Sequence, residues 1–193
     1  MIGNTLSLAH QADLFSFSLT GRKDVMRLTV TLILALLCLF GSDFDADCRS
    51  GLNWLAGHPK LAPGKIGVTG FCIGGHLAFR AAFQPDVRAT VCYYGTGIHD
   101  GKLGQDADAG SLARGKEIRG ELLMIFGTKD PHIPDAGRET IDRALKSSVI
   151  RCNTLLYPAE HAFTRDEGPR FDPEATDQSF AEMITLFRRV FQQ

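Results

Sequence analysis

Apolar and polar residues alternate in blocks along this chain, and the blocks indicate strands separated by helices. Three segments have the pattern and length of strands, and a fourth strand pattern surrounds Cys92. The three segments are residues 65–69, 122–127 and 149–157, and the second of them has the continuous apolar run of a buried strand. Strands that alternate with helical segments are typical of a mostly parallel sheet flanked by helices. The pattern therefore predicts an α/β fold for most of the chain.

Two further segments have apolar residues at helical spacing. Residues 47–55 predict a helix that packs Leu52, Trp54 and Leu55 inward. Residues 178–191 predict a C-terminal helix, and the spacing of its apolar residues favours a face packed on the core over a binding stripe. Both helices are expected to contribute to the core.

The N-terminal quarter does not follow this rhythm. Residues 28–40 form one apolar run, which is shorter than the roughly 20 residues of a membrane-spanning helix. A buried strand or core helix is the favoured interpretation. A secretory signal peptide is the alternative, because Arg22, Lys23 and Arg27 precede the run, although residues 41–45 make a poor cleavage site.

Composition favours one domain, residues 1–193, in a reducing compartment. A net charge of −1 gives no sign of a surface for nucleic acid or membranes. The five cysteines are odd in number and include no C-x-x-C pair, which argues against a disulfide framework. We therefore expect a cytoplasmic protein, or a secreted one if residues 28–40 are a signal sequence. The histidine spacings do not suit a metal site.

The residues after the first predicted strand carry the clearest chemical signal. Gly70-Phe71-Cys72-Ile73-Gly74-Gly75 has the pattern of a nucleophile elbow, G-x-S-x-G, with cysteine in place of serine. Glycines permit a tight turn between the strand and the next helix. The N-terminus of that helix would favour the thiolate of Cys72, the reactive form of cysteine. The alternative is that Cys72 is a small buried apolar residue.

Two other polar residues follow later strands. Asp130 comes after residues 122–127, and His161 comes after residues 149–157. The carboxyl ends of neighbouring parallel strands face one crevice. Nucleophile, acid and histidine also occur in the chain order of an α/β-hydrolase triad. Cys72, Asp130 and His161 are therefore the candidate catalytic residues.

Each of the last two has a simpler interpretation. Asp130 precedes Pro131, and aspartate before proline is a common turn element. His161 could be a surface histidine, and His132, two residues past the acid, is its nearest rival for the catalytic role.

Three motifs together resemble the dienelactone hydrolase family. They are Gly70–Gly75, Gly127–Asp130 and His161–Arg165, and the resemblance covers roughly residues 45–193. It implies a cytosolic α/β-hydrolase fold without a cofactor, in which a cysteine attacks the ester carbonyl of a small lactone. By this resemblance Cys72 is the nucleophile, His161 is the general base and acid, and Asp130 orients the histidine.

Further residues are expected at the substrate. The resemblance assigns Arg165 to the substrate carboxylate, which the planar guanidinium suits, while a local salt bridge is its alternative role. The backbone N–H of Ile73 is the expected oxyanion donor. Phe71, His76 and Tyr94 are expected to contact the substrate. No position matches the family's early-loop glutamate, which bonds the resting cysteine, or its second arginine.

The resemblance also implies several strands before the elbow, and only residues 1–45 are available for them. The chain is therefore expected to be N-terminally truncated or altered, with residues 46–193 as the family-like core. Without earlier neighbours, the strand at residues 65–69 becomes an exposed edge, which is a site for pairing with other chains. This edge could be covered by residues 28–40 or by a second subunit, or it could stay uncovered.

We thus expect a cysteine-dependent hydrolase of small ester or enol-lactone substrates, with no nucleic-acid or membrane partner. One alternative is a catalytically impaired hydrolase-fold protein that acts by binding. Another is a thiol redox sensor, which would need Cys92 or Cys152 as its resolving cysteine.

Overall fold

The computed structural model describes residues 15–16, 41–59 and 64–192 of the chain. The expectations for residues 28–40 lie outside this part. The helices are α1 (Gly41–Ala56), α2 (Ile73–Ala81), α3 (Asp135–Ser147), α4 (Pro173–Phe191) and the 3₁₀ helix η2 (Leu112–Glu117). The strands are β1 (Phe15–Ser16), β2 (Ile66–Phe71), β3 (Val87–Tyr93), β4 (Glu121–Gly127) and β5 (Cys152–Tyr157).

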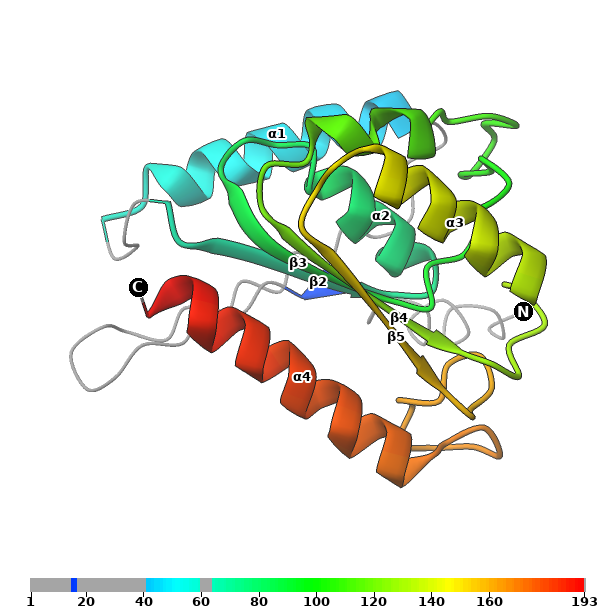
Figure 1. Cartoon of the computed structure of the whole chain (residues 1–193). Helices are drawn as coiled ribbons and strands as arrows, with labels where there is room; N and C mark the ends of the chain where they lie inside the picture. Colours follow the sequence, from blue (N-terminus) through cyan, green and yellow to red (C-terminus); the bar gives the residue numbers. More distant parts are fainter. Residues whose placement is uncertain (1–14, 17–40, 60–63, 193) are drawn as a thin grey trace, which may run out of the picture.

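The strands form one sheet in the order β1-β2-β3-β4-β5. The strands β2 to β5 are parallel, and β1 is antiparallel to β2. Figure 1 shows α1, α2 and α3 on one face of the sheet and α4 on the other. This three-layer arrangement confirms the predicted α/β fold and places the carboxyl ends of the parallel strands along one edge.

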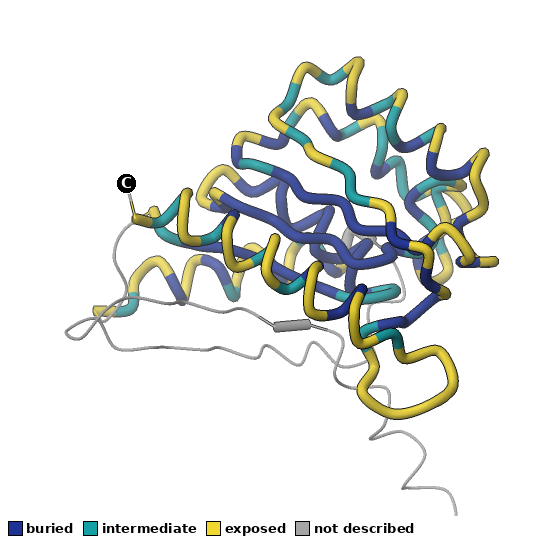
Figure 2. The backbone as a smooth tube through the Cα atoms, turned by 60° about the horizontal axis from the view of Figure 1, so that its bottom comes forward, coloured by how far each residue is buried: buried dark blue, intermediate teal, exposed yellow. Residues whose placement is uncertain are grey.

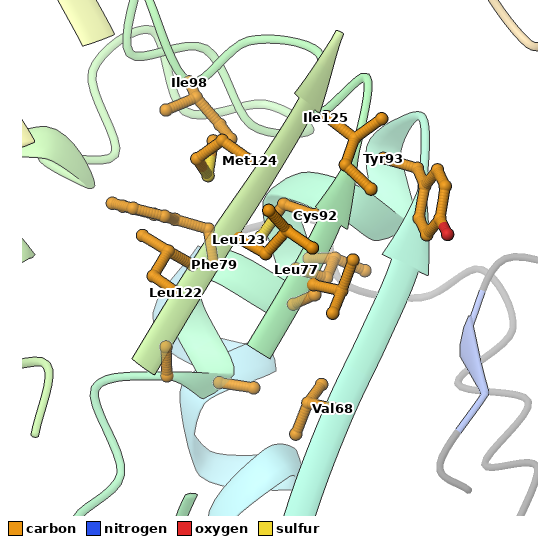
Figure 3. Packing of buried hydrophobic residues seen from close by; sticks show 14 of the residues in the cluster. Val68, Leu77, Phe79, Cys92, Tyr93, Ile98, Leu122, Leu123, Met124 and Ile125 are labelled. Atoms are coloured by element: carbon orange, nitrogen blue, oxygen red, sulfur yellow. The ribbon is translucent and has the colours of Figure 1, made fainter. Parts of the chain in front are cut away.

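The core lies in the middle of the sheet, where helices cover both faces (Figure 2). Val68, Phe79, Cys92 and Met124 have no exposed surface, and they come from β2, α2, β3 and β4 (Figure 3). Strands buried on both faces have continuous apolar runs, because neither side of the strand meets water. This explains why β2 and β4 could be predicted from the sequence pattern.

The two predicted outer helices differ in how well their inward faces were predicted. Most apolar residues of α4 pack against the core, and Gly67 of β2 leaves room for the rings of Phe187 and Phe191. Ile184, which was expected on the same face, is 43% exposed. In α1, Leu52 and Leu55 are buried as expected, but Trp54 is 60% exposed. The prediction for Trp54 is wrong because the inward face of this helix follows the line of Phe44, Cys48, Leu52 and Leu55, which excludes position 54.

The expected exposed edge at β2 is also corrected. Phe15 pairs with Gly70 and Ser16 with Thr69, so β1 covers the carboxyl-terminal end of β2. Residues 66–70 of β2 are buried throughout. A two-residue strand is too short for an alternating pattern, and nothing in the sequence distinguishes it. Among the described residues, no helix is both long and apolar enough to cross a membrane.

Candidate active site

The turn between β2 and α2 holds Cys72 in an unusual backbone conformation. Cys72 has φ 56° and ψ −123°, a backbone conformation that residues other than glycine rarely adopt. A Cβ atom at Gly70 would lie 2.0 Å from the Gly74 carbonyl oxygen, and one at Gly75 would lie 2.6 Å from the Tyr93 carbonyl oxygen. Both glycines are therefore required by the close contact of strand, turn and helix.

Backbone hydrogen bonds fix this turn to the neighbouring strand and its loop. The Cys72 N–H donates to the Tyr93 carbonyl at 3.1 Å. The Cys72 carbonyl accepts from the N–H of Gly75 at 2.9 Å and from that of Thr96 at 3.2 Å. Such bonds offset the strain at Cys72, because a rare conformation persists only where the surroundings enforce it. The side chain of Cys72 is half-buried.

The structure brings Asp130 and His161 to this sulfur. His161 Nε2 is 3.2 Å from Cys72 Sγ, and His161 Nδ1 is 2.7 Å from Asp130 Oδ2. A carboxylate only accepts, so Nδ1 carries the proton and donates it to Asp130. The other carboxylate oxygen, Oδ1, accepts from the His132 N–H at 2.8 Å. Asp130 and His161 are 3% and 4% exposed, so both are shielded from water.

The contacts of the sulfur and the imidazole favour an ion pair. Burial by itself raises the pKa of the Cys72 thiol, but the bond to His161 and its charge outweigh burial, with smaller contributions from the Ile73 N–H and the Thr96 hydroxyl. The pKa of Cys72 therefore lies below its ordinary value of 9.0. Burial lowers the pKa of His161, but the bonds to Asp130 and Cys72 outweigh it and raise that pKa to about 9. This arrangement shifts both groups toward the ion pair of thiolate and imidazolium.

Aromatic side chains surround the imidazole. The Tyr94 ring lies 5.1 Å from that of His161, and its hydroxyl is 2.5 Å from Thr164 Oγ1. Burial raises the pKa of Tyr94 to about 12, so it stays a neutral phenol. Phe71 is half-buried and stacks on Tyr93 at 4.6 Å. These contacts place Tyr94 beside the candidate catalytic histidine, and Phe71 next to Tyr94.

The remaining predicted site residues differ in their positions. Ile73 directly follows Cys72 as the first residue of α2, and its N–H helps to lower the pKa of the Cys72 thiol. Arg165 is exposed, and its charge is close enough to the Tyr94 hydroxyl to oppose the rise of that pKa. Within the described part of the chain, Arg165 forms no ion pair, so the alternative of a local salt bridge has no support. His132 is exposed, with its ring 4.6 Å from that of His161, and it makes no bond to the sulfur.

His76 is not available to a substrate. Its side chain has no exposed surface, Nδ1 bonds the Thr96 carbonyl at 3.0 Å, and Nε2 bonds Ser111 Oγ at 2.7 Å. Its predicted place at the substrate is therefore corrected to a buried position that holds Thr96. The sequence interpretation missed Thr96, although it follows β3 just as Asp130 follows β4. The rule that polar residues after strand ends gather at one crevice could have found it.

The other described cysteines are poor partners for Cys72. Neither Cys92 nor Cys152 forms a disulfide in the part of the chain that the structure covers. Burial raises the pKa of Cys92 well above its usual range and that of Cys152 to about 11. Neither thiol is therefore readily ionised.

The described residues also include no group of three or more His, Cys, Asp or Glu side chains that could hold a metal ion.

Comparison with known proteins connects this geometry to a family. Residues 36–191 match the dienelactone hydrolase family. A Saccharomyces cerevisiae relative is 36% identical over 152 residues, covering 76% of this chain and 56% of its own length. A carboxymethylenebutenolidase of Pseudomonas sp. strain P51 is 28% identical over 148 residues, covering 77% of this chain and 57% of its own. The chain thus spans a little over half the length of these relatives.

Solved structures have the same fold. A crystal structure from Klebsiella pneumoniae has a TM-score of 0.66 and 27% identity, covering 74% of this chain and 59% of the other. A dienelactone hydrolase-like promiscuous phosphotriesterase from metagenomic libraries has a TM-score of 0.63 and 22% identity. The match covers 77% of this chain and 62% of the other. These likenesses identify the described fold as that of an α/β-hydrolase.

The contact between His161 and Cys72 predicts how Cys72 reacts as the pH changes. Alkylation of Cys72 by iodoacetamide follows its thiolate fraction, so its rate should be half-maximal below pH 9.0. In His161→Ala, burial still raises the pKa of the Cys72 thiol, but the bond that opposes burial is lost. The pH at which alkylation is half-maximal should therefore rise by about one unit or more. The rate is measured by mass spectrometry of the Cys72 peptide.

His132→Ala is the matched control, because this ring touches the imidazole but not the sulfur. It should keep the wild-type midpoint. Equal midpoints in folded His161→Ala and wild-type protein would contradict the ion pair.

Proposed function

The chain belongs to the dienelactone hydrolase family, and on that premise we propose that it hydrolyses small ester or enol-lactone substrates with Cys72 as the nucleophile. The observation that supports this most is the continuous line of contacts from Asp130 through His161 to the Cys72 sulfur. This is the geometry that nucleophilic acyl transfer needs: a nucleophile, a base that bonds it, and a third group that orients the base.

The first half of the reaction forms a thioester. The Cys72 thiolate attacks the ester carbonyl carbon, and the carbonyl electrons move to the oxygen, which becomes an oxyanion. The N–H of Ile73, at the N-terminus of α2, is the proposed donor to this oxyanion. The intermediate then collapses, the carbon–oxygen ester bond breaks, and the imidazolium of His161 gives its Nε2 proton to the departing alkoxide or enolate.

The second half releases the acid. Neutral His161 takes a proton from water, and the resulting hydroxide attacks the thioester carbonyl. His161 is the imidazolium again once it holds this proton, and collapse of the second intermediate expels the Cys72 thiolate, which restores the ion pair. Asp130 holds Nδ1–H in both halves, which keeps Nε2 directed at the sulfur and stabilises the imidazolium when it forms. The chemistry requires no metal or organic cofactor.

The nucleophile restricts the proposed substrates. A thiolate is also a good leaving group, so the first intermediate collapses forward only when the departing oxygen is a comparably stable anion. Enolates from enol-lactones and phenolates from aryl esters meet this condition, whereas amines from peptide bonds do not. The proposed substrates are therefore small activated esters and lactones.

Hydrolysis by purified protein tests the proposed nucleophile. Wild-type protein should hydrolyse p-nitrophenyl acetate and a dienelactone, and Cys72→Ala should lower both rates by about 10³-fold or more, since the covalent route is lost. Cys152→Ala is the matched control, a thiol-to-methyl change on β5 that should leave both rates unchanged.

Circular dichroism must show all three proteins folded. Equal rates for Cys72→Ala and wild type would contradict the nucleophile. A folded wild type without activity would contradict hydrolysis and favour the alternative of a hydrolase-fold protein that acts by binding.

Arg165 is the proposed contact for a substrate carboxylate. Its exposed guanidinium lies near Tyr94, next to the reacting groups, and has no partner among the ion pairs of the described residues. Arg165→Gln should raise KM for the carboxylate-bearing dienelactone roughly 10-fold or more through loss of a charged hydrogen bond. KM for the neutral p-nitrophenyl acetate should not change.

Arg170→Gln supplies the control, because Arg170 is also exposed and lies in the same loop. In this variant, KM for both substrates should equal the wild-type value. If Arg165→Gln raised KM equally for the neutral and the charged substrate, the anion-binding role would be contradicted.

A further inference from the structure

The side chain of Tyr94 contacts three residues of the turn that runs from His161 to Arg165. Its ring lies edge to face at 5.1 Å from the ring of His161 and at 5.4 Å from that of Phe163. Its hydroxyl is 2.5 Å from Thr164 Oγ1. We propose that Tyr94 is a positioning residue whose ring supports His161 and whose hydroxyl, through Thr164, supports Arg165. This inference rests on the proposed function, in which His161 is the base and Arg165 is the carboxylate contact.

Tyr94 itself is held in one position by the sheet. Its φ is 36°, in the left-handed region that favours glycine. Its N–H donates to the Ile125 carbonyl of β4 at 2.6 Å, and only 1% of the residue is exposed. Strained residues persist where their surroundings enforce the conformation, and they gather at functional sites. Among the described residues other than glycine, four have a positive φ, and three of them are Cys72, Tyr94 and Ala162. The strain is therefore concentrated at the nucleophile and around the base.

The turn has anchors on both sides of Thr164. On one side, the Phe163 carbonyl accepts from the backbone N–H of the N-cap residue of α4 at 3.0 Å. On the other side, the Arg165 N–H donates to the Ala162 carbonyl at 3.1 Å and closes the turn. Thr164 directly precedes Arg165, so its bond to the Tyr94 hydroxyl fixes the part of the turn from which the guanidinium extends.

The ring and the hydroxyl of Tyr94 should therefore affect different steps. The ring lies against the imidazole, whose Nε2 must stay directed at the Cys72 sulfur. A small displacement of a reacting group slows the chemical step, so loss of the ring should lower kcat. The hydroxyl acts on Arg165, which is proposed to hold the substrate carboxylate away from the reacting atoms. Its loss should therefore raise KM, and only for substrates that carry a carboxylate.

Two alkylating agents of similar shape test the hydroxyl without any turnover. Both react with the Cys72 thiolate, but iodoacetate carries a carboxylate and iodoacetamide does not. The ratio of their rates therefore reports the contact with an anion at the site. In Tyr94→Phe this ratio should fall about 5-fold, the effect of one lost hydrogen bond. The rates are measured at low ionic strength by mass spectrometry of the Cys72 peptide.

Tyr93→Phe is the matched control, because it removes the same atom from the neighbouring residue. The Tyr93 hydroxyl donates to the Ser179 carbonyl of α4 at 3.0 Å, and Tyr93 has no exposed surface. This variant should keep the wild-type ratio. A folded Tyr94→Phe protein with the wild-type ratio would overturn the role of the hydroxyl. An equal fall in Tyr93→Phe would also overturn it, because a merely structural loss would produce that result.

Double variants test the path through Thr164. Thr164→Val should lower the ratio as Tyr94→Phe does, whereas Thr164→Ser keeps a hydroxyl and should stay close to the wild type. Tyr94→Phe combined with Thr164→Val should have no lower ratio than either change alone, because both remove the same bond. Tyr94→Phe added to Arg165→Gln should likewise change nothing further. Additive falls in either double variant would overturn the path.

Steady-state kinetics test the division between ring and hydroxyl. Tyr94→Phe keeps the ring, so KM for the dienelactone should rise about 5-fold while kcat stays at the wild-type value. Tyr94→Leu removes both groups and should also lower kcat for the dienelactone and p-nitrophenyl acetate by about 10-fold or more. A Tyr94→Leu protein that circular dichroism shows folded, with the wild-type kcat, would overturn the role of the ring. A fall of kcat in Tyr94→Phe would contradict the division.

The two measurements separate this inference from the proposed function. An alkylation ratio that depends on Tyr94, in a protein without turnover, contradicts only the hydrolase. Turnover by the wild type, with an unchanged ratio in Tyr94→Phe, contradicts only the role of the hydroxyl. An unchanged ratio in Arg165→Gln would contradict the carboxylate contact itself, and with it the role of the hydroxyl.

Discussion

The backbone turn at Cys72 is the constraint on which the rest of the site depends. Its positive φ holds only because Gly70 and Gly75 let strand, turn and helix approach to distances that a Cβ would forbid. Bonds to Tyr93 and Thr96 then fix the turn to β3 and its loop. The turn places the sulfur at the carboxyl edge of the sheet, where β4 and β5 deliver Asp130 and His161. A more relaxed turn would direct the sulfur away from them.

Around this turn, burial and hydrogen bonding act in opposite directions on the same groups. Burial disfavours both the thiolate of Cys72 and the imidazolium of His161. The bonds between them and to Asp130 reverse both effects, so each charge depends on the other. This coupling explains why the proposed site needs a buried carboxylate as well as a nucleophile and a base.

Much of this arrangement could be predicted from the sequence because it depends on local patterns. Buried parallel strands have continuous apolar runs, and the elbow has a fixed glycine spacing around Cys72. The positions of Asp130 and His161 follow from parallel strands ending at one edge. The functional roles of these residues are proposals, but their proximity was foreseeable.

The rest depends on tertiary contacts that leave little signal in the sequence. The strand Phe15–Ser16 consists of two backbone pairings, and Trp54 is exposed because the inward face of α1 runs along other residues. His76 was expected at the substrate because it follows the elbow closely. Its actual partners, Thr96 and Ser111, are brought to it only by the folding of residues 95–111 over α2.

The most direct test of the central claim is to trap the acyl intermediate. Wild-type protein is mixed with excess p-nitrophenyl acetate, quenched in acid during the first turnovers and digested for mass spectrometry. The account predicts an acetyl thioester on the peptide that contains Cys72, removed by hydroxylamine at neutral pH and absent in Cys72→Ala. Turnover with the acetyl group on another residue, or with no acylation of Cys72, would contradict it.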